Sequence, residues 1–204
     1  MIHDVEQGSP EWRALRVGRP CASEFSKVVT SNGQPSKSAA GYAITLAAEL
    51  FAGKSIDAWE GNQWTERGKE LEAEAIMFYE FVRDLTVNRV GFVTDADQYG
   101  CSPDGFIGDD GLLEIKSLKA ENHVRAILHF QKYGYCSSDY VMQPQGQLMI
   151  TGRKWVDLLF YHPDLPPLII RLEAVPDLHA ALRAELPKVI AERDRVLEAL
   201  RKAE

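Results

Sequence analysis

Long apolar runs are missing from this chain of 204 residues, which argues against a membrane protein. The longest such run, 43–52, is interrupted by Thr45 and Glu49 and is too short to span a bilayer. The first residues, Met1-Ile2-His3-Asp4, have neither the basic patch nor the apolar core of a signal peptide. We therefore expect a cytoplasmic protein with no membrane partner.

Cysteine and positive charge are also scarce. The three cysteines, Cys21, Cys101 and Cys136, are too widely spaced to suggest a disulfide framework or a zinc site. Lys and Arg number 23 against 30 Asp and Glu, giving a net charge of −7. Phosphate contacts normally come from a basic surface. Composition alone therefore favours a protein without a nucleic-acid partner, although a small basic surface inside an acidic shell stays open.

The patterning predicts one domain, 1–204, of mixed α/β or α+β class. Stretches with apolar residues at helical spacing enclose short β-favouring runs that are bounded by Gly/Asp turns. The expected helices span 38–52, 65–83, 121–132, 138–151 and, at the C-terminus, about 177–203. The expected strands span 86–93, 100–107, 112–118, 155–162 and 168–174.

The chemistry is concentrated around Ser102-Pro103-Asp104-Gly105 and Glu114-Ile115-Lys116. Side chains alternate across a strand, so Glu114 and Lys116 share one face. A turn at Asp109-Asp110-Gly111 would fold the strand of Asp104 back beside them. Mg²⁺ prefers carboxylate oxygens and keeps several waters, one of which can attack phosphorus. Lys116 would lower the pKa of that water or hold the phosphate.

A solvated surface hairpin is the alternative interpretation of these residues, because a bare Asp…Glu-x-Lys match is common. Two further polar motifs count against it. Glu72 lies in a predicted helix, in Arg67-Gly68-Lys69-Glu70-Leu71-Glu72, and Gln145 lies in another, in Gln143-Pro144-Gln145. Taken singly, each of these two motifs is typical of a solvated helix face.

Taken together, the motifs resemble the lambda exonuclease and YqaJ-type viral recombinase family of PD-(D/E)xK nucleases. The resemblance covers about residues 5–162, and its motifs occur in the family's order. They are Val5-Glu6-Gln7-Gly8-Ser9-Pro10-Glu11-Trp12-Arg13-Ala14-Leu15-Arg16-Val17-Gly18 with Ala22-Ser23-Glu24, the Glu72 helix, Ser102-Pro103-Asp104-Gly105, Glu114-Ile115-Lys116, and 140–145. The resemblance implies a restriction-endonuclease-like core, in which helices flank a central mixed β-sheet.

The resemblance also implies roles for individual residues. Asp104, Glu114 and the Ile115 carbonyl would be the metal ligands, and Lys116 the catalytic lysine. Glu72 would lie in or near the metal's water shell. Gln145 would orient the attacking water or the phosphate. The implied cofactor is Mg²⁺, with two ions per active site and with Mn²⁺ as a substitute.

A 5′-phosphate pocket is implied as well. Arg16 and Ser23 match it, since a planar guanidinium beside a hydroxyl suits a terminal phosphate, and Ser102 would join them. The sequence departs from the family at Cys21, where threonine is usual. Asn122 stands where lambda exonuclease has a phosphate-pocket arginine, so we expect a weaker pocket, or one rebuilt from the flanking Lys119 and His123.

Trp64 lies near the family's strand-separating wedge, although Thr65 matches that position more directly. An aromatic side chain there could stack on a base. The alternative is a packing anchor at the start of a helix.

The resemblance implies an exodeoxyribonuclease that digests one strand of linear duplex DNA from 5′ to 3′ and leaves a 3′ overhang. The implied partners are duplex ends, preferably 5′-phosphorylated, and a single-strand annealing protein, for phage or prophage recombination in the cytoplasm of a bacterial host. The implied assembly is a ring-shaped homotrimer, whose channel would gather the basic residues of an acidic chain. A PD-(D/E)xK endonuclease and a non-catalytic DNA-end-binding scaffold remain the alternatives.

Overall fold

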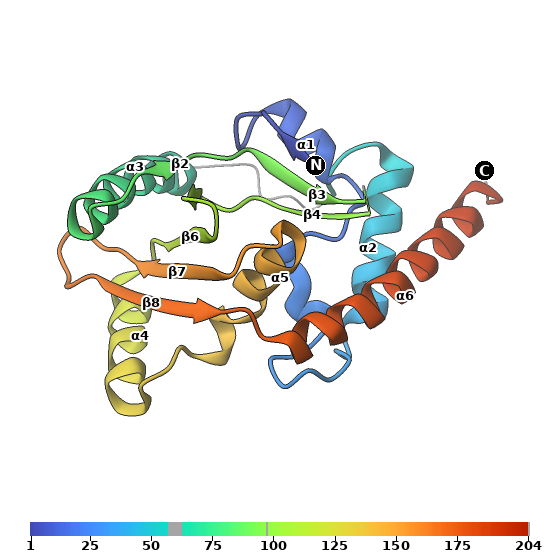
Figure 1. The fold of residues 1–204 in the computed structure, drawn as a ribbon. Coiled ribbons are helices and arrows are strands. Elements are labelled where there is room, and N and C mark those ends of the chain that lie inside the picture. The colour runs from blue at the N-terminus through green and yellow to red at the C-terminus, as the bar shows by residue number, and fades with distance from the viewer. Residues whose placement is uncertain (57–62, 97, 204) are drawn as a thin grey trace.

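The computed structural model describes residues 1–56, 63–96 and 98–203, and of residues 63–70 the backbone only. It has the mixed α/β architecture that the sequence predicts (Figure 1). The helices are α1 (Pro10–Arg16), α2 (Ala39–Ala52), α3 (Gln63–Arg83), α4 (Ala120–Tyr133), α5 (Met142–Thr151) and α6 (Pro176–Arg201), with 3₁₀ helices η1 (Ala22–Lys27) and η2 (Ser138–Tyr140). The strands are β1 (Ile2–His3), β2 (Val87–Asn88), β3 (Phe92–Asp95), β4 (Tyr99–Cys101), β5 (Gly105–Ile107), β6 (Gly111–Lys116), β7 (Trp155–Phe160) and β8 (Leu168–Glu173).

The larger sheet has five strands in the order β2-β5-β6-β7-β8. Its β6–β7 pair is parallel and the other neighbours are antiparallel, so the sheet is mixed. Successive residues of β7 pack on opposite sides. Leu159 joins the apolar cluster of Tyr79 on α3, whereas Leu158 and Phe160 join that of Ala126 on α4. Helices therefore flank this central sheet, as predicted.

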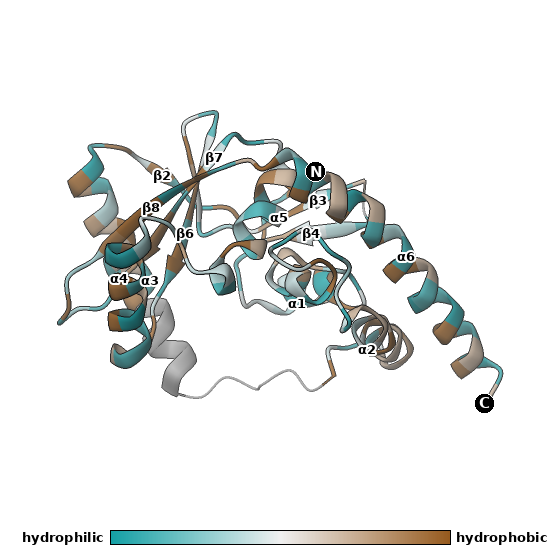
Figure 2. Cartoon of the chain, turned by 90° about the horizontal axis from the view of Figure 1, so that it is seen from below, coloured by the Kyte–Doolittle hydropathy of each residue, from teal (hydrophilic) through white to brown (hydrophobic). Residues whose placement is uncertain are grey.

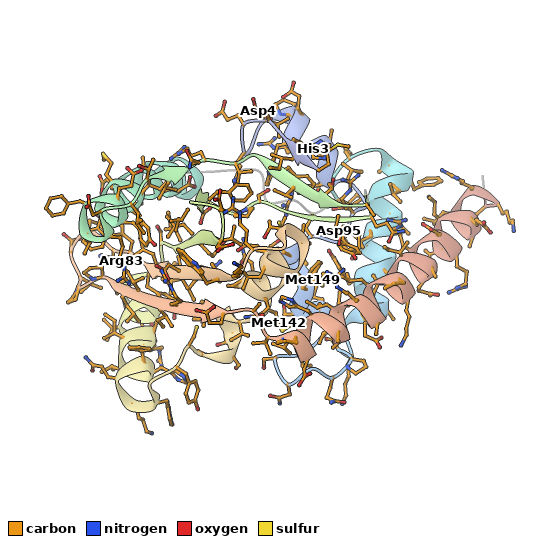
Figure 3. All side chains as sticks on the ribbon, viewed as in Figure 1. His3, Asp4, Arg83, Asp95, Met142 and Met149 are labelled. Carbon is orange, nitrogen blue, oxygen red and sulfur yellow. The ribbon has the colours of Figure 1, made fainter. Side chains whose placement is uncertain are left out.

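The smaller sheet has three strands in the order β1-β3-β4. Helix α5 connects the two sheets. Its Leu148 packs with Leu112 of the larger sheet, while Met142 and Met149, labelled in Figure 3, pack in the cluster that contains Val93 of the smaller one. α5 is buried along most of its length, so its polar side chains face protein on several sides.

The C-terminal helix expected at 177–203 is α6, which packs along α2. Apolar and polar residues alternate along it (Figure 2). The apolar ones include Leu182 and Leu186, which share a buried cluster with Leu46 of α2. Among the described residues, no helix combines the length and apolar character that a bilayer crossing requires.

Two strand predictions were wrong in the same way. The expected strands 86–93 and 100–107 are each split between the two sheets, β2 from β3 and β5 from β4. One interruption falls at Ser102-Pro103-Asp104, where Pro103 has no N–H to donate to a ladder. The break leaves Asp104 at the junction between the sheets.

The three cysteines are free thiols in the interior. Burial raises the pKa of Cys21 and raises that of Cys101 well above its usual value. It also raises the pKa of Cys136 to about 11. All three therefore stay protonated near neutral pH.

Candidate active site

Asp104 is fixed to the strand that carries Glu114. The Asp104 backbone N–H donates a hydrogen bond to the Leu113 carbonyl at 3.1 Å. In return, the Ile115 N–H donates to Asp104 Oδ2 at 2.5 Å. These two bonds hold the Asp104 loop against β6, so the two carboxylates that sequence analysis paired do come together.

Glu114 is almost fully buried, at 3% exposure, and accepts hydrogen bonds from three side chains. Lys116 Nζ lies 2.7 Å from its Oε1, and Gln143 Nε2 donates to the same oxygen at 2.6 Å. Gln147 Nε2 donates to Oε2 at 2.6 Å. Because a buried charge is costly unless it is paired and hydrogen-bonded, this side chain needs these donors, and they hold it in one orientation.

Lys116 lies on the same face of β6 as Glu114, as strand alternation requires. Its ammonium is held between Glu114 Oε1 and Gln143 Oε1, the latter at 2.8 Å. Ile115 points to the opposite side, into the cluster beneath α3. The lysine charge is therefore fixed directly beside the carboxylate pair.

Burial makes the Asp104 carboxyl costly to ionise. Loss of water around this carboxyl raises its pKa well above the usual range, and the nearby Glu114 charge raises it further. Glu72 contributes in the same direction, while the Ile115 N–H and Lys116 oppose the rise. A cation bound at this position would remove the penalty for ionising Asp104.

The donor set fits Mg²⁺. In the described part of the chain, no group of three or more His, Cys, Asp or Glu side chains is arranged to hold a metal ion. Asp104 and Glu114 offer two carboxylates, with the Ile115 backbone carbonyl adjacent. Mg²⁺ is commonly bound through one or two carboxylates and retains several waters, so a sparse oxygen site of this kind suits it.

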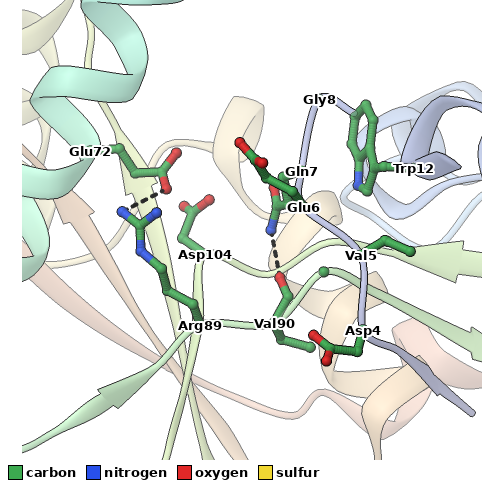
Figure 4. A pocket seen from close by; sticks show the side chains of 11 residues that line it. Asp4, Val5, Glu6, Gln7, Gly8, Trp12, Glu72, Arg89, Val90 and Asp104 are labelled. Atoms are coloured by element: carbon green, nitrogen blue, oxygen red, sulfur yellow. Dashed lines mark hydrogen bonds and ion pairs between the residues drawn. The ribbon is translucent and has the colours of Figure 1, made fainter. Parts of the chain in front are cut away.

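Glu72 approaches the same place from α3. It lines a cavity of about 470 Å³ together with Asp104, Arg89 and residues of the N-terminal segment (Figure 4). Arg89 Nη2 lies 3.5 Å from Glu72 Oε1. Glu72 therefore borders the Asp104 site, whereas its position in the metal's water shell stays a prediction.

Gln145 does not join the cluster, contrary to the sequence expectation. Its side chain donates to the Glu173 carbonyl at 2.8 Å and accepts from the Val175 N–H at 2.9 Å, on the side of α6. Gln143 and Gln147 take its place at Glu114. Residues four apart share a helix face, but residues two apart do not, so the helical phase of α5 could have identified this pair.

A second cluster lies beside the carboxylates. The Arg16 guanidinium stacks over the Trp12 ring, 4.4 Å from its centroid, and Arg16 Nη2 donates to Ser23 Oγ at 3.2 Å. Trp12 Nε1 donates to Ser102 Oγ at 2.7 Å. The structure thus joins the predicted phosphate-binding residues to the Asp104 segment through Trp12, a motif residue to which sequence analysis gave no role.

Three residues that the sequence analysis connected with this pocket, Cys21, Asn122 and His123, have other surroundings in the structure. Cys21 is buried, and its Sγ donates to the Arg19 carbonyl. Asn122 lines a separate cavity beside Arg125. His123 is fully buried, with Nε2 at 2.9 Å from the Pro166 carbonyl. The expectation that His123 helps to rebuild the phosphate pocket was therefore wrong, because its ring belongs to the core.

The strand-separating wedge predicted near Trp64 and Thr65 lies where the structure describes only the backbone. Trp64 and Thr65 belong to the first turns of α3, and their side chains lie outside the described residues.

Comparisons with known proteins agree with the motif interpretation. The YqaJ-like viral recombinase domain matches residues 11–154. An alkaline exonuclease from Laribacter hongkongensis is 32% identical, with 96% of this chain and 97% of that chain covered and a TM-score of 0.81. The structure of its complex with dAMP is likewise 32% identical, with 96% of this chain and 98% of that chain covered and a TM-score of 0.82.

A phage-related exonuclease from Haemophilus somnus is 15% identical, with 89% of this chain and 96% of that chain covered and a TM-score of 0.71, a likeness of fold alone. A search of curated proteins finds no match. The family match spans most of the chain, and the resemblance inferred from the motifs is confirmed. This chain belongs to the YqaJ-like viral recombinase family.

Proposed function

We propose that this protein is a Mg²⁺-dependent exodeoxyribonuclease that digests one strand of linear duplex DNA from 5′ to 3′ and leaves a 3′ overhang. The observation that carries the proposal is the adjacency of two clusters. Asp104, Glu114 and Lys116 form a hydrolytic site, and Ser102, two residues before Asp104, connects it to Trp12 and Arg16. An anchored 5′-terminal phosphate would then place the adjoining phosphodiester bond near the carboxylates.

Each residue has a definite task in this mechanism. Asp104, Glu114 and the Ile115 carbonyl would hold the cation, while Gln143 and Gln147 fix the orientation of Glu114. When bound, Mg²⁺ supplies the charge that activates a water and offsets charge on the leaving oxygen. Lys116 binds the scissile phosphate from the same face, and Glu72 orders water at the edge of the site.

The 5′ polarity of the proposal rests on Arg16. A terminal phosphate carries more charge than an internal one, and a guanidinium can give it two aligned hydrogen bonds. Stacking on Trp12 limits the conformations of this guanidinium before DNA arrives. The related alkaline exonuclease has been solved with dAMP, a nucleoside monophosphate of the class that an exonuclease releases.

Assembly and partners belong to the same proposal. A homotrimeric ring around the DNA would gather basic residues in its channel and leave the exterior acidic, which accommodates the net charge of −7. A single-strand annealing protein would receive the overhang, in the cytoplasm of a bacterial host. Light scattering coupled to gel filtration tests the trimer.

One assay tests the activity against its two alternatives. Linear and covalently closed duplexes are incubated with the protein, with Mg²⁺ or with EDTA, beside Asp104→Ala. Loss of nucleotides from linear DNA alone, only with Mg²⁺ and only with wild type, is the expected result. Cleavage of the closed circle would indicate an endonuclease, and binding of ends without degradation would indicate a scaffold.

A further inference from the structure

The two strand breaks described above lie opposite each other in one hairpin. Val87 pairs with Ile107 on one side of the breaks, and Val93 pairs with Cys101 on the other. The number of residues from Val87 to Val93 equals the number from Cys101 to Ile107, so the pairing register is the same on both sides of the breaks. The ladder is therefore opened at 89–91 and 102–104 without any slip, and we call this opening the seam.

The side chain of Gln7 fills the seam. Its Nε2 donates to the Val90 carbonyl at 2.8 Å and to the Pro103 carbonyl at 3.0 Å (Figure 4 shows the first bond). A side-chain amide has two N–H groups, so one nitrogen can satisfy both carbonyls. Gln7 thereby bridges the two strands at the residue that immediately precedes Asp104.

Backbone contacts bring Gln7 to this position. The N-terminal amine donates to the Thr94 carbonyl at 2.6 Å, and the Thr94 N–H donates to the Met1 carbonyl at 2.8 Å. Gly91, in the seam, lets the following segment pass closely. A Cβ on Gly91 would lie 2.1 Å from the Val5 carbonyl oxygen, which is closer than packing allows. The approach of the segment that carries Gln7 thus requires glycine at this position.

The other edge of the Asp104 segment is bound to β6. The Asp104 N–H donates to Leu113, and the Asp104 carboxylate accepts from Ile115. Asp104 is therefore held between two sets of hydrogen bonds, from β6 on one side and from Gln7, through Pro103, on the other. On the β6 side the Asp104 N–H bond to Leu113 is ordinary backbone pairing, whereas on the other side the Pro103 carbonyl accepts from a side chain.

We infer that Gln7 is a positioning residue for the metal site: its amide keeps the seam open so that the Asp104 carboxylate stays beside Glu114. The inference rests on the proposed function for the metal role of Asp104. Without the two N–H donors, the Val90 and Pro103 carbonyls must find other partners, and the Asp104 segment shifts with them. Binding of the cation weakens even though neither carboxylate has been changed.

The test measures Mn²⁺ binding by electron paramagnetic resonance, together with unfolding temperature in EDTA and kcat on linear duplex. Gln7→Met keeps the length of the side chain but has no donor. Gln98→Met is the matched control, because Gln98 is exposed near the turn of the same hairpin. Gly91→Ala displaces the N-terminal segment while leaving Gln7 itself unchanged.

We expect Gln7→Met and Gly91→Ala each to weaken Mn²⁺ binding on the order of 10-fold, the scale of residues that orient metal ligands, with kcat rescued in part by excess metal. Gln98→Met should match wild type. Mn²⁺ binding by folded Gln7→Met as tight as by Gln98→Met would overturn the inference. Should Gln7→Met not fold, undiminished binding by Gly91→Ala would do the same.

Asp104→Ala separates this inference from the proposed function. If Asp104→Ala binds Mn²⁺ normally and still degrades DNA, the metal site itself is misassigned. If Asp104→Ala loses both properties while Gln7→Met keeps them, only the role of Gln7 fails.

Discussion

The Ile115 backbone N–H donates a 2.5 Å hydrogen bond to Asp104 Oδ2. Ile115, which follows the proposed ligand Glu114, thus orients the other carboxylate ligand, Asp104. The β5–β6 hairpin therefore sets the spacing of the two carboxylates. Any substitution of Asp104 that keeps an acceptor should preserve this bond and so separate metal binding from folding.

Asp104→Asn should lose hydrolysis but keep or gain stability in EDTA. Removal of a ligand at a cost of about 4 kcal/mol in transition-state stabilisation corresponds to about a 10³-fold lower rate. Activity on linear duplex and thermal unfolding in EDTA measure the two effects. Near-wild-type turnover of Asp104→Asn would place the active site elsewhere.

The same pair of proteins should differ in how stability depends on pH. The pKa of Asp104 is raised in the folded state, so between the unfolded and folded values the native protein binds more protons than the unfolded chain. Wild-type stability in EDTA therefore increases as pH falls through the folded pKa. Asp104→Asn lacks this contribution. The free energy of unfolding of wild type should therefore increase relative to that of Asp104→Asn as pH falls, which denaturation at several pH values measures.

Gln147→Met and Gln145→Met lie on the same helix, but the first should mainly lower kcat and the second should mainly lower stability. Gln147 donates to Glu114, so its loss should lower kcat by a factor of about 10–100. Loss of Gln145 leaves the Val175 N–H without its acceptor, at a cost of about 1–3 kcal/mol, with little change in kcat. Initial rates and urea unfolding distinguish them, and equal effects on kcat would contradict the assignment.

Arg16→Ala should impair initiation more than cleavage of a single bond. Wild type should prefer a duplex with a 5′-phosphate over the same duplex with a 5′-hydroxyl, and Arg16→Ala should lose most of that preference. Removal of a charged hydrogen-bond partner costs about 1.5–3 kcal/mol, or roughly 10- to 100-fold in kcat/KM. Arg13→Ala, an exposed arginine on the same helix, is the control. Equal wild-type rates on both duplexes would remove the pocket from the proposal.

Tyr79→Phe should lower stability without removing the active site. The Tyr79 hydroxyl donates to Asp157 Oδ2 at 2.7 Å in the core, while Arg171 donates to both oxygens of the same carboxylate. Since Arg171 remains, we expect a loss of about 1 kcal/mol. Chemical denaturation measures it, and an unchanged midpoint would show that the bond contributes nothing.

Local signals predicted helices α2 to α6 and most of the larger sheet, but not α1 (Pro10–Arg16). The helix expected at 38–52 is observed as Ala39–Ala52, with Gly53 in the left-handed conformation at its end. The strand expected at 112–118 is Gly111–Lys116. Hydrophobic periodicity and turn residues are signals carried by residues close together in the sequence. These elements were predictable because such local signals are enough to define them.

Elements that depend on distant partners were not predictable in this way. Strand β1 contains only Ile2 and His3 and exists because they pair with β3. The split of 100–107 depends on Pro103 and also on Gln7, which is remote in sequence. The error at Gln145 was of another kind, since family order selected the motif but did not fix which glutamine of α5 faces Glu114.

The burial of the three thiols has a practical consequence for fluorescent labelling. A thiol reacts as its thiolate, and buried cysteines with raised pKa values are inert. Cys21, Cys101 and Cys136 can therefore remain in place when a single cysteine is introduced on the surface and coupled to a fluorophore. Each chain then carries one dye at a chosen position, in an otherwise natural sequence.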